Sequence, residues 1–311
     1  MHRRFMIAAP VGAALYFSVA ASAVSAQEAP PPAAQQGSSP QAGQPAGPRV
    51  GIPTDVATGT VYDDNWISIG IGAGLGPSYS GSDDYAVFAV PILQGKYAGI
   101  GIAPRPGGLA LDLIDDAPGS AVNFNLGPAF RLRSDRASQI KDDVVKRAGE
   151  LDRAYEVGVS AEVGKPALLN PYDSLSFILD ARWDVAGAHG GMVIEPAVSY
   201  FTPLSRGMAA VLTVSAEYAD DDFNSYYYTV DAAQSLASGL DRYEADAGFN
   251  SVGTNLLLAI DLDGNLQNGG ISAVLIGGYS RLVGDAKNTP YTKERGSADQ
   301  FFGAAGIAYT F

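Results

Sequence analysis

Apolar and polar residues alternate with a period of two along most of the chain after Trp66. In the segment 122–133, Phe124 and Leu126 point to one side, and Asn123 and Asn125 point to the other. Such alternation predicts a β-strand whose two faces meet different surroundings. The predicted strands are 67–75, 85–93, 96–103, 107–113, 122–133, 155–163, 175–185, 192–201, 208–218, 247–260, 271–279 and 301–311.

Two all-β architectures use this pattern. A soluble sandwich buries its apolar face, whereas a membrane barrel turns that face to lipid. The lengths of the predicted connections favour the barrel. The long ones, 134–152, 219–246 and 284–300, all follow odd-numbered strands, and those after even-numbered strands are shorter. We therefore predict a transmembrane antiparallel β-barrel of the outer-membrane type with about twelve strands, ten being the alternative count.

The ends of the chain agree with export to the outer membrane of a Gram-negative bacterium. Arg3 and Arg4 precede an apolar run and a stretch of small residues, which predicts a secretory signal peptide over 1–26. Residues 27–60 form a Pro/Ala/Gln-rich linker that we expect to be disordered in the periplasm, and the barrel spans 61–311. The last strand ends on aromatic residues, so Ile307, Tyr309 and Phe311 are the candidate insertion signal for the barrel-assembly machinery.

Composition excludes several function classes. The formal net charge of −13 argues against nucleic-acid binding, which needs a basic surface. The absence of cysteine excludes disulfides and thiolate chemistry, and the chain has only 2 histidines. His189 lies among glycines and is interpreted as a turn residue, so a barrel hydrolase that depends on it is the least favoured function.

The other motifs give no site for a metal or cofactor. Gly70, Gly72, Gly74 and Gly76 alternate strictly and do not match a phosphate-binding loop. The segment 261–265 resembles the start of a calcium loop but fits a hairpin turn better. Acidic pairs such as Asp83 and Asp84 could bridge lipopolysaccharide through divalent cations, but solvated loops are the preferred interpretation. We therefore predict no enzyme, no cofactor and no metal.

Two sets of residues remain as candidates. The first is a group of charges on the polar faces of the strands, expected to line the lumen: Arg131, Arg133, Glu156, Glu162, Asp180, Arg182, Asp184, Glu195 and Glu217. The second is a plug loop containing a short helix over 232–239, with Gln234, Ser235, Ser238, Gly239, Leu240 and Tyr243. The alternative is a loop helix packed outside the barrel mouth. An acid-rich open lumen would favour cations, whereas a closed one requires the charges to pair.

Several local sequences resemble the MipA/OmpV family of outer-membrane proteins. They are GPSYSGSDDY at 76–85, GPAFRLR at 127–133, the terminal GIAYTF and, most specifically, the stretch 227–249 around Gln234–Tyr243. The resemblance covers roughly 61–311, and the long linker departs from it. The resemblance implies that the protein is a non-enzymatic scaffold that links a murein transglycosylase to a murein synthase. A narrow channel for small solutes is the alternative, and outer-membrane lipid and lipopolysaccharide are expected surroundings.

Overall fold

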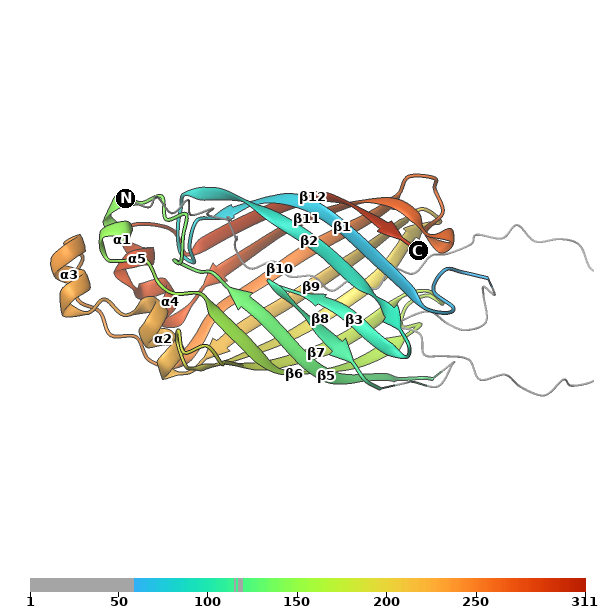
Figure 1. Ribbon diagram of the computed structural model, residues 1–311, viewed down its shortest axis with the longest axis horizontal. Helices are drawn as coiled ribbons and strands as arrows, with labels where there is room; N and C mark the ends of the chain where they lie inside the picture. The colour runs from blue at the N-terminus through green and yellow to red at the C-terminus, as the bar shows by residue number, and fades with distance from the viewer. Residues whose placement is uncertain (1–58, 115, 117–119) are drawn as a thin grey trace, which may run out of the picture.

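A computed structural model describes residues 59–114, 116 and 120–311. The predicted signal peptide and nearly all of the linker lie outside these residues. Within them, twelve strands form one closed antiparallel barrel in which each strand pairs with the next and β12 pairs with β1 (Figure 1). The fold predicted from the alternation is confirmed. None of the helices in the described part of the chain is long and apolar enough to cross a membrane.

The strands differ in length, and two of them are short. The barrel consists of β1 Trp66–Pro77, β2 Tyr85–Tyr97, β3 Ile100–Arg105, β4 Gly108–Asp112, β5 Asn123–Arg133, β6 Ala154–Pro166, β7 Ser174–Asp184, β8 Met192–Ser205, β9 Met208–Ala219, β10 Gly248–Asp261, β11 Gly270–Leu282 and β12 Asp299–Thr310. The helices are α1 Asp143–Arg147, α2 Asp221–Tyr228, α3 Ala232–Ser238, α4 Gly284–Asn288, α5 Pro290–Lys293 and the 3-10 turn η1 Leu266–Asn268.

The two ends of the barrel are built differently. All five α-helices lie in connections after odd-numbered strands and gather at one end, whereas the last strand finishes at the other end (Figure 1). The predicted parity of long and short connections is therefore confirmed. The end that carries the five α-helices is the helical end of the barrel, and the opposite end is the turn end. Long loops at one end and short turns at the other are typical of outer-membrane barrels.

The outward side chains are largely apolar. Ile71, Phe124 and Ile307 alternate with inward neighbours and are about half exposed or more. An apolar outer surface suits a barrel in lipid, because hydrocarbon then meets apolar side chains while the paired strands satisfy their backbone groups within the sheet. The predicted orientation of the apolar faces is confirmed for these strands.

One turn was predicted at the wrong residues. The turn expected at 94–95 does not form, and β2 continues to Tyr97 before turning at Ala98 and Gly99, which both have positive φ. Gly95 serves a different purpose: a side chain there would begin only 2.4 Å from the Trp66 carbonyl of β1. Glycine at 95 therefore permits a close strand contact, whereas glycine at 99 permits the turn.

The inner surface is polar on only part of the wall. Opposite β5–β7, inward side chains of β2 and β8–β12 form an apolar core that includes Phe88, Val90, Phe201, Leu257 and Ile276. This contradicts a uniformly polar lumen. These side chains contact one another instead of water, so burying them is favourable on the inside of the barrel as well as in a soluble core.

Candidate functional site

The predicted lumen charges meet on the inner wall formed by β5–β9. Arg131 Nη1 lies 2.8 Å from Glu195 Oε1, which joins β5 to β8. Arg133 Nε donates to Glu156 Oε1 at 2.7 Å, and its Nη2 donates to Glu217 Oε2 at 2.9 Å. The strands thus place inward arginines and carboxylates within reach of one another across the lumen.

Arg182 extends this network from β7. Its guanidinium contacts Glu156 at 3.3 Å, Asp180 at 2.9 Å and Glu195. Both Arg182 and Glu156 are 1% exposed. Burial of single charges is very costly, so these groups are stable only because each arginine contacts two or more carboxylates.

Arg105 belongs to the same network, although it is not among the residues predicted to line the lumen. Its Nε donates to Asp180 at 3.2 Å, and its Nη2 lies 3.8 Å from Glu162. The predicted strand over 96–103 ended before this residue. The hairpin glycine at 107 could have indicated that Arg105 is the last inward position of β3.

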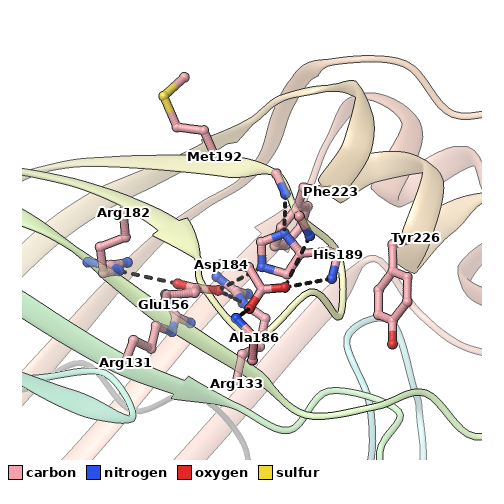
Figure 2. A network of polar contacts seen from close by, with 12 residues as sticks. Arg131, Arg133, Glu156, Arg182, Asp184, Ala186, His189, Met192, Phe223 and Tyr226 are labelled. Carbon is pink, nitrogen blue, oxygen red and sulfur yellow. Dashed lines mark hydrogen bonds and ion pairs between the residues drawn. The ribbon is translucent and has the colours of Figure 1, made fainter.

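Asp184 lies at the edge of the network and binds a loop. Its carboxylate accepts the backbone N–H groups of Ala186, His189 and Gly190 at 3.0, 2.9 and 3.1 Å (Figure 2). These bonds satisfy donors of the β7–β8 turn that would otherwise be unpaired. Asp184 therefore shapes the loop that carries His189.

His189 is buried, which the interpretation as a plain turn residue missed. Its Nδ1 accepts the Gly191 N–H at 3.1 Å, so Nε2 carries the proton in the neutral ring. Nε2 lies 3.5 Å from Glu156 Oε1. The ring packs edge-on against Phe223 at 4.9 Å between centroids, close to the ion pairs (Figure 2). This position makes His189 a link between the network and helix α2.

Helix α2 closes the helical end above the network. Its N-cap Asp220 accepts the N–H groups of Phe223 and Met192, which fixes the helix to β8. Phe223 and Tyr227 are both 1% exposed, and the Arg133 guanidinium lies 4.7 Å from the centre of the Phe223 ring. Cation–π contacts of this kind stabilise a desolvated arginine.

Helix α3 forms as predicted but does not enter the barrel. Asp231 and Gln234 make a reciprocal capping box, and Gly239 ends the helix with φ 82°. Leu236 is 90% exposed, and α3 is the helix farthest from the barrel wall (Figure 1). The structure therefore places α3 outside the mouth, as in the alternative prediction, and not inside the lumen. α3 has no apolar face large enough to stabilise an inserted position.

The other residues of the predicted plug join α3 to the cap of the barrel. Ser235 Oγ donates to the Leu240 carbonyl, and Ser238 Oγ donates to that of Gln234. Leu240 is buried in a cluster that includes residues of α1 and α5, and the Tyr243 hydroxyl donates to Asp285 at 2.6 Å.

A cavity lies at the helical end, between the apolar part and the charged part of the inner wall. Its volume is about 140 Å³, and it is lined by Phe88 and Phe302 on one side and Arg131, Arg133 and Glu217 on the other. Among residues 59–114, 116 and 120–311, no group of three or more His, Asp or Glu side chains is arranged to hold a metal ion.

Comparison with known families shows to which family the chain belongs. The family model described as MltA-interacting protein MipA matches residues 69–311. The chain belongs to the MipA family. The match includes every strand after the start of β1, the charged network and the 227–249 stretch that suggested the resemblance.

Solved structures give more distant similarities. An outer membrane channel from Pseudomonas putida F1 is 15% identical, with a TM-score of 0.39 over 83% of this chain and 100% of that one. The outer membrane channel DcaP of Acinetobacter baumannii is 11% identical, with a TM-score of 0.28 over 80% of this chain and 96% of that one. Comparison with curated proteins finds no match.

The candidate insertion signal lies on the outer surface of this MipA-family barrel. Ile307, Tyr309 and Phe311 are each more than half exposed, and the rings of Tyr309 and Phe311 stack with centroids 6.1 Å apart. Phe311 also exchanges backbone hydrogen bonds with Ile67 at the start of β1. These residues therefore lie at the seam where the barrel closes.

Proposed function

We propose that this protein is a non-enzymatic scaffold of the outer membrane that holds murein-hydrolysing and murein-synthesising enzymes near the cell wall. The single observation that supports this proposal is the filled lumen. A barrel without an open path is better suited to docking proteins than to conducting solutes. The description of the family as MltA-interacting agrees with a docking role.

Different interactions fill the two halves of the lumen. Toward the turn end, Phe201, Leu257 and Ile276 pack in the apolar core, and Leu266 of η1 joins them from the turn after β10. Toward the helical end, the ion pairs and α2 occupy the space beside the cavity. Water and ions have little access to an apolar, close-packed interior. We therefore rank the scaffold above the narrow channel.

We place the docking surface on the turn end, which would face the periplasm. The turn between β6 and β7 has a suitable anchor in Leu169, which is 78% exposed. Exposed apolar residues on rigid segments are typical anchors of protein interfaces.

Asp173 makes this turn rigid. Its carboxylate accepts the N–H groups of Leu168, Leu169 and Asn170 and the Tyr200 hydroxyl. Burial raises the pKa of Asp173, but these hydrogen bonds outweigh burial, and the pKa lies below its usual value. The stabilisation is present above the usual pKa and is lost as pH falls through the lowered one.

Co-purification of the full chain with a murein transglycosylase tests the proposal. We expect wild type to retain the enzyme and Leu169→Lys to lose at least about tenfold of the affinity, as for an interface anchor. Leu236→Lys on α3 is the matched control, because it makes the same change at the helical end and should leave retention unchanged. No retention by wild type, or equal loss in both variants, would contradict the docking surface.

Conductance of the purified barrel in a planar bilayer tests the filled lumen separately. We expect insertion without current steps. Stable ohmic steps would instead favour the narrow channel and remove the observation on which the scaffold proposal rests.

A further inference from the structure

We infer that the cavity at the helical end binds a small neutral amphiphile, such as a medium-chain alcohol, which enters sideways from the membrane between β2 and the β3–β4 hairpin. This inference does not depend on the scaffold function. It rests on three features of the wall and the cavity: an interrupted strand ladder, an apolar surface on either side of it, and unpaired donors behind it.

The ladder between β2 and β3 is short. β2 pairs with β1 from Tyr85 to Lys96, but it pairs with β3 only at Gly95–Ile102, Lys96–Gly101 and Tyr97–Ile100. Among the residues that the structure describes, the rest of β2 has no strand partner on this side. Toward the helical end, β2 and the β3–β4 hairpin diverge (Figure 1).

The hairpin is too short to close this gap. It turns at residues 106–107, and its second strand pairs with β5 only up to Gly108 opposite Arg131. Pro91 in β2 and Pro104 in β3 lie on the two sides of the gap. Proline has no N–H for a ladder, so both margins disfavour an added strand from a partner protein.

The gap lies at a level where the outer surface is apolar. Val87 on β2 and Phe301 on β12 are 66% and 57% exposed, and Phe130 on β5 is exposed beyond the gap. Open sheet edges are costly in contact with lipid unless the backbone lines a cavity inside the protein. The exposed apolar residues around the gap thus indicate that lipid-soluble molecules reach it.

The cavity lies directly inside the gap. It is lined by Ala86 and Phe88 from the unpaired part of β2 and by Arg131 and Arg133 from β5. The loop after β5 covers it from the helical end, since Lys141 Nζ donates to the Tyr85 carbonyl. The apolar core closes the cavity toward the turn end. The site therefore suits binding of a ligand rather than its passage through the barrel.

The lining predicts the class of ligand. Phe88 and Phe302 offer an apolar surface, and cavities of roughly 150 Å³ in other proteins bind benzene. Arg131 is 4% exposed, and its Nε has no hydrogen-bond partner, as is true of the Ser134 and Ser138 hydroxyls in the same lining. Because Arg131 and Arg133 already pair with carboxylates, a neutral hydroxyl fits this head-group position better than an ion.

Photolabelling of the full chain in lipid nanodiscs with octanol that carries a diazirine tests the binding. We expect saturable labelling of Phe88 and Phe302 that unlabelled octanol suppresses. The outward residues Val87 of β2 and Leu75 of β1, which pair with each other and do not line the cavity, should be labelled in simple proportion to the concentration. Labelling confined to Val87 and Leu75 would overturn the proposal and leave the open edge to other partners.

Variants separate filling of the cavity from surface effects. Ala86→Phe and Ser280→Phe add volume from two different strands and should each lower the labelling of Phe302 about tenfold. Val87→Phe, one residue along β2 and outward, should leave it unchanged. Heat-shift electrophoresis verifies that each barrel is folded. Unchanged labelling in both folded inward variants would contradict the site.

The rate of labelling tests the route. Ala89→Trp places a large ring on the outer face of β2 at the gap and should slow the labelling of Phe88 several-fold without changing its plateau. Leu275→Trp, on the outer face of β11, is the control and should not slow it. Equal rates in both variants would overturn lateral entry.

Discussion

Glu195 shows how single side chains hold the charged wall together. Its carboxylate contacts Arg131 of β5 and Arg182 of β7, so three strands depend on one buried group. Glu195 is 5% exposed, which leaves little water to solvate either arginine if the contact is lost. By contrast, the ion pair of Arg281 with Asp299 is nearly half exposed on both sides.

Replacement of Glu195 by Gln should therefore be strongly destabilising. We expect a loss of about 3–5 kcal/mol in the free energy of unfolding, because two buried arginines lose a counter-charge. Urea unfolding of the barrel in detergent, followed by heat-shift electrophoresis, measures this loss. Arg281→Gln is the control and should show no measurable change, because water solvates that pair. Similar losses in the two variants would refute the buried network.

At the scale of elements, α2 and α3 show why two helices of one loop take different positions. Both begin at an aspartate N-cap. α2 carries Phe223 and Tyr227, whose rings fill the space above Arg133, whereas the one large apolar residue of α3, Leu236, contacts solvent. Apolar burial holds a short helix in place, since propensity alone does not.

Deletion of residues 231–242 should leave the barrel folded and its conductance unchanged. The cut joins Val230 to Tyr243, which already exchange backbone hydrogen bonds at 2.9 and 3.1 Å. It removes α3, which lies outside the mouth. Planar-bilayer recording of the deletion variant beside wild type measures the outcome. New current steps in the variant would show that α3 obstructs the lumen after all.

At the scale of the whole molecule, a barrel in lipid must keep charges on its inner side. Leu126 lies outward on β5 and is 47% exposed, whereas Asn125 points inward and lies opposite Glu162 of β6. The two faces of one strand therefore differ sharply in the cost of an added charge.

Substitution of arginine at these neighbouring positions tests the orientation of the whole barrel. Leu126→Arg should cost about 2–4 kcal/mol if the residue lies near the bilayer centre, because the charge would meet hydrocarbon. Asn125→Arg should cost little, since Glu162 can pair with it. Reversible unfolding in phospholipid vesicles compares the two. Equal tolerance would contradict the assignment of the faces.

The sequence by itself determined the architecture of the barrel. The strict alternation in β1, β5, β6 and β7 is visible without tertiary contacts, because an outer face in lipid selects apolar residues at every second position. The short helix α3 and its end at Gly239 were also predictable from the sequence, since a helix end at glycine depends on local backbone geometry.

Only the tertiary structure decided how the lumen is filled. The charged network joins residues that are far apart in the chain: Arg105 of β3, Glu156 of β6 and His189 of the β7–β8 loop. The register of the sheet brings them together. The inward apolar residues of β2 hid its alternation, because both faces of that strand contact apolar surroundings. The unpaired edge of β2 follows from the short β3–β4 hairpin, and such a mismatch in strand length has no local sequence signal.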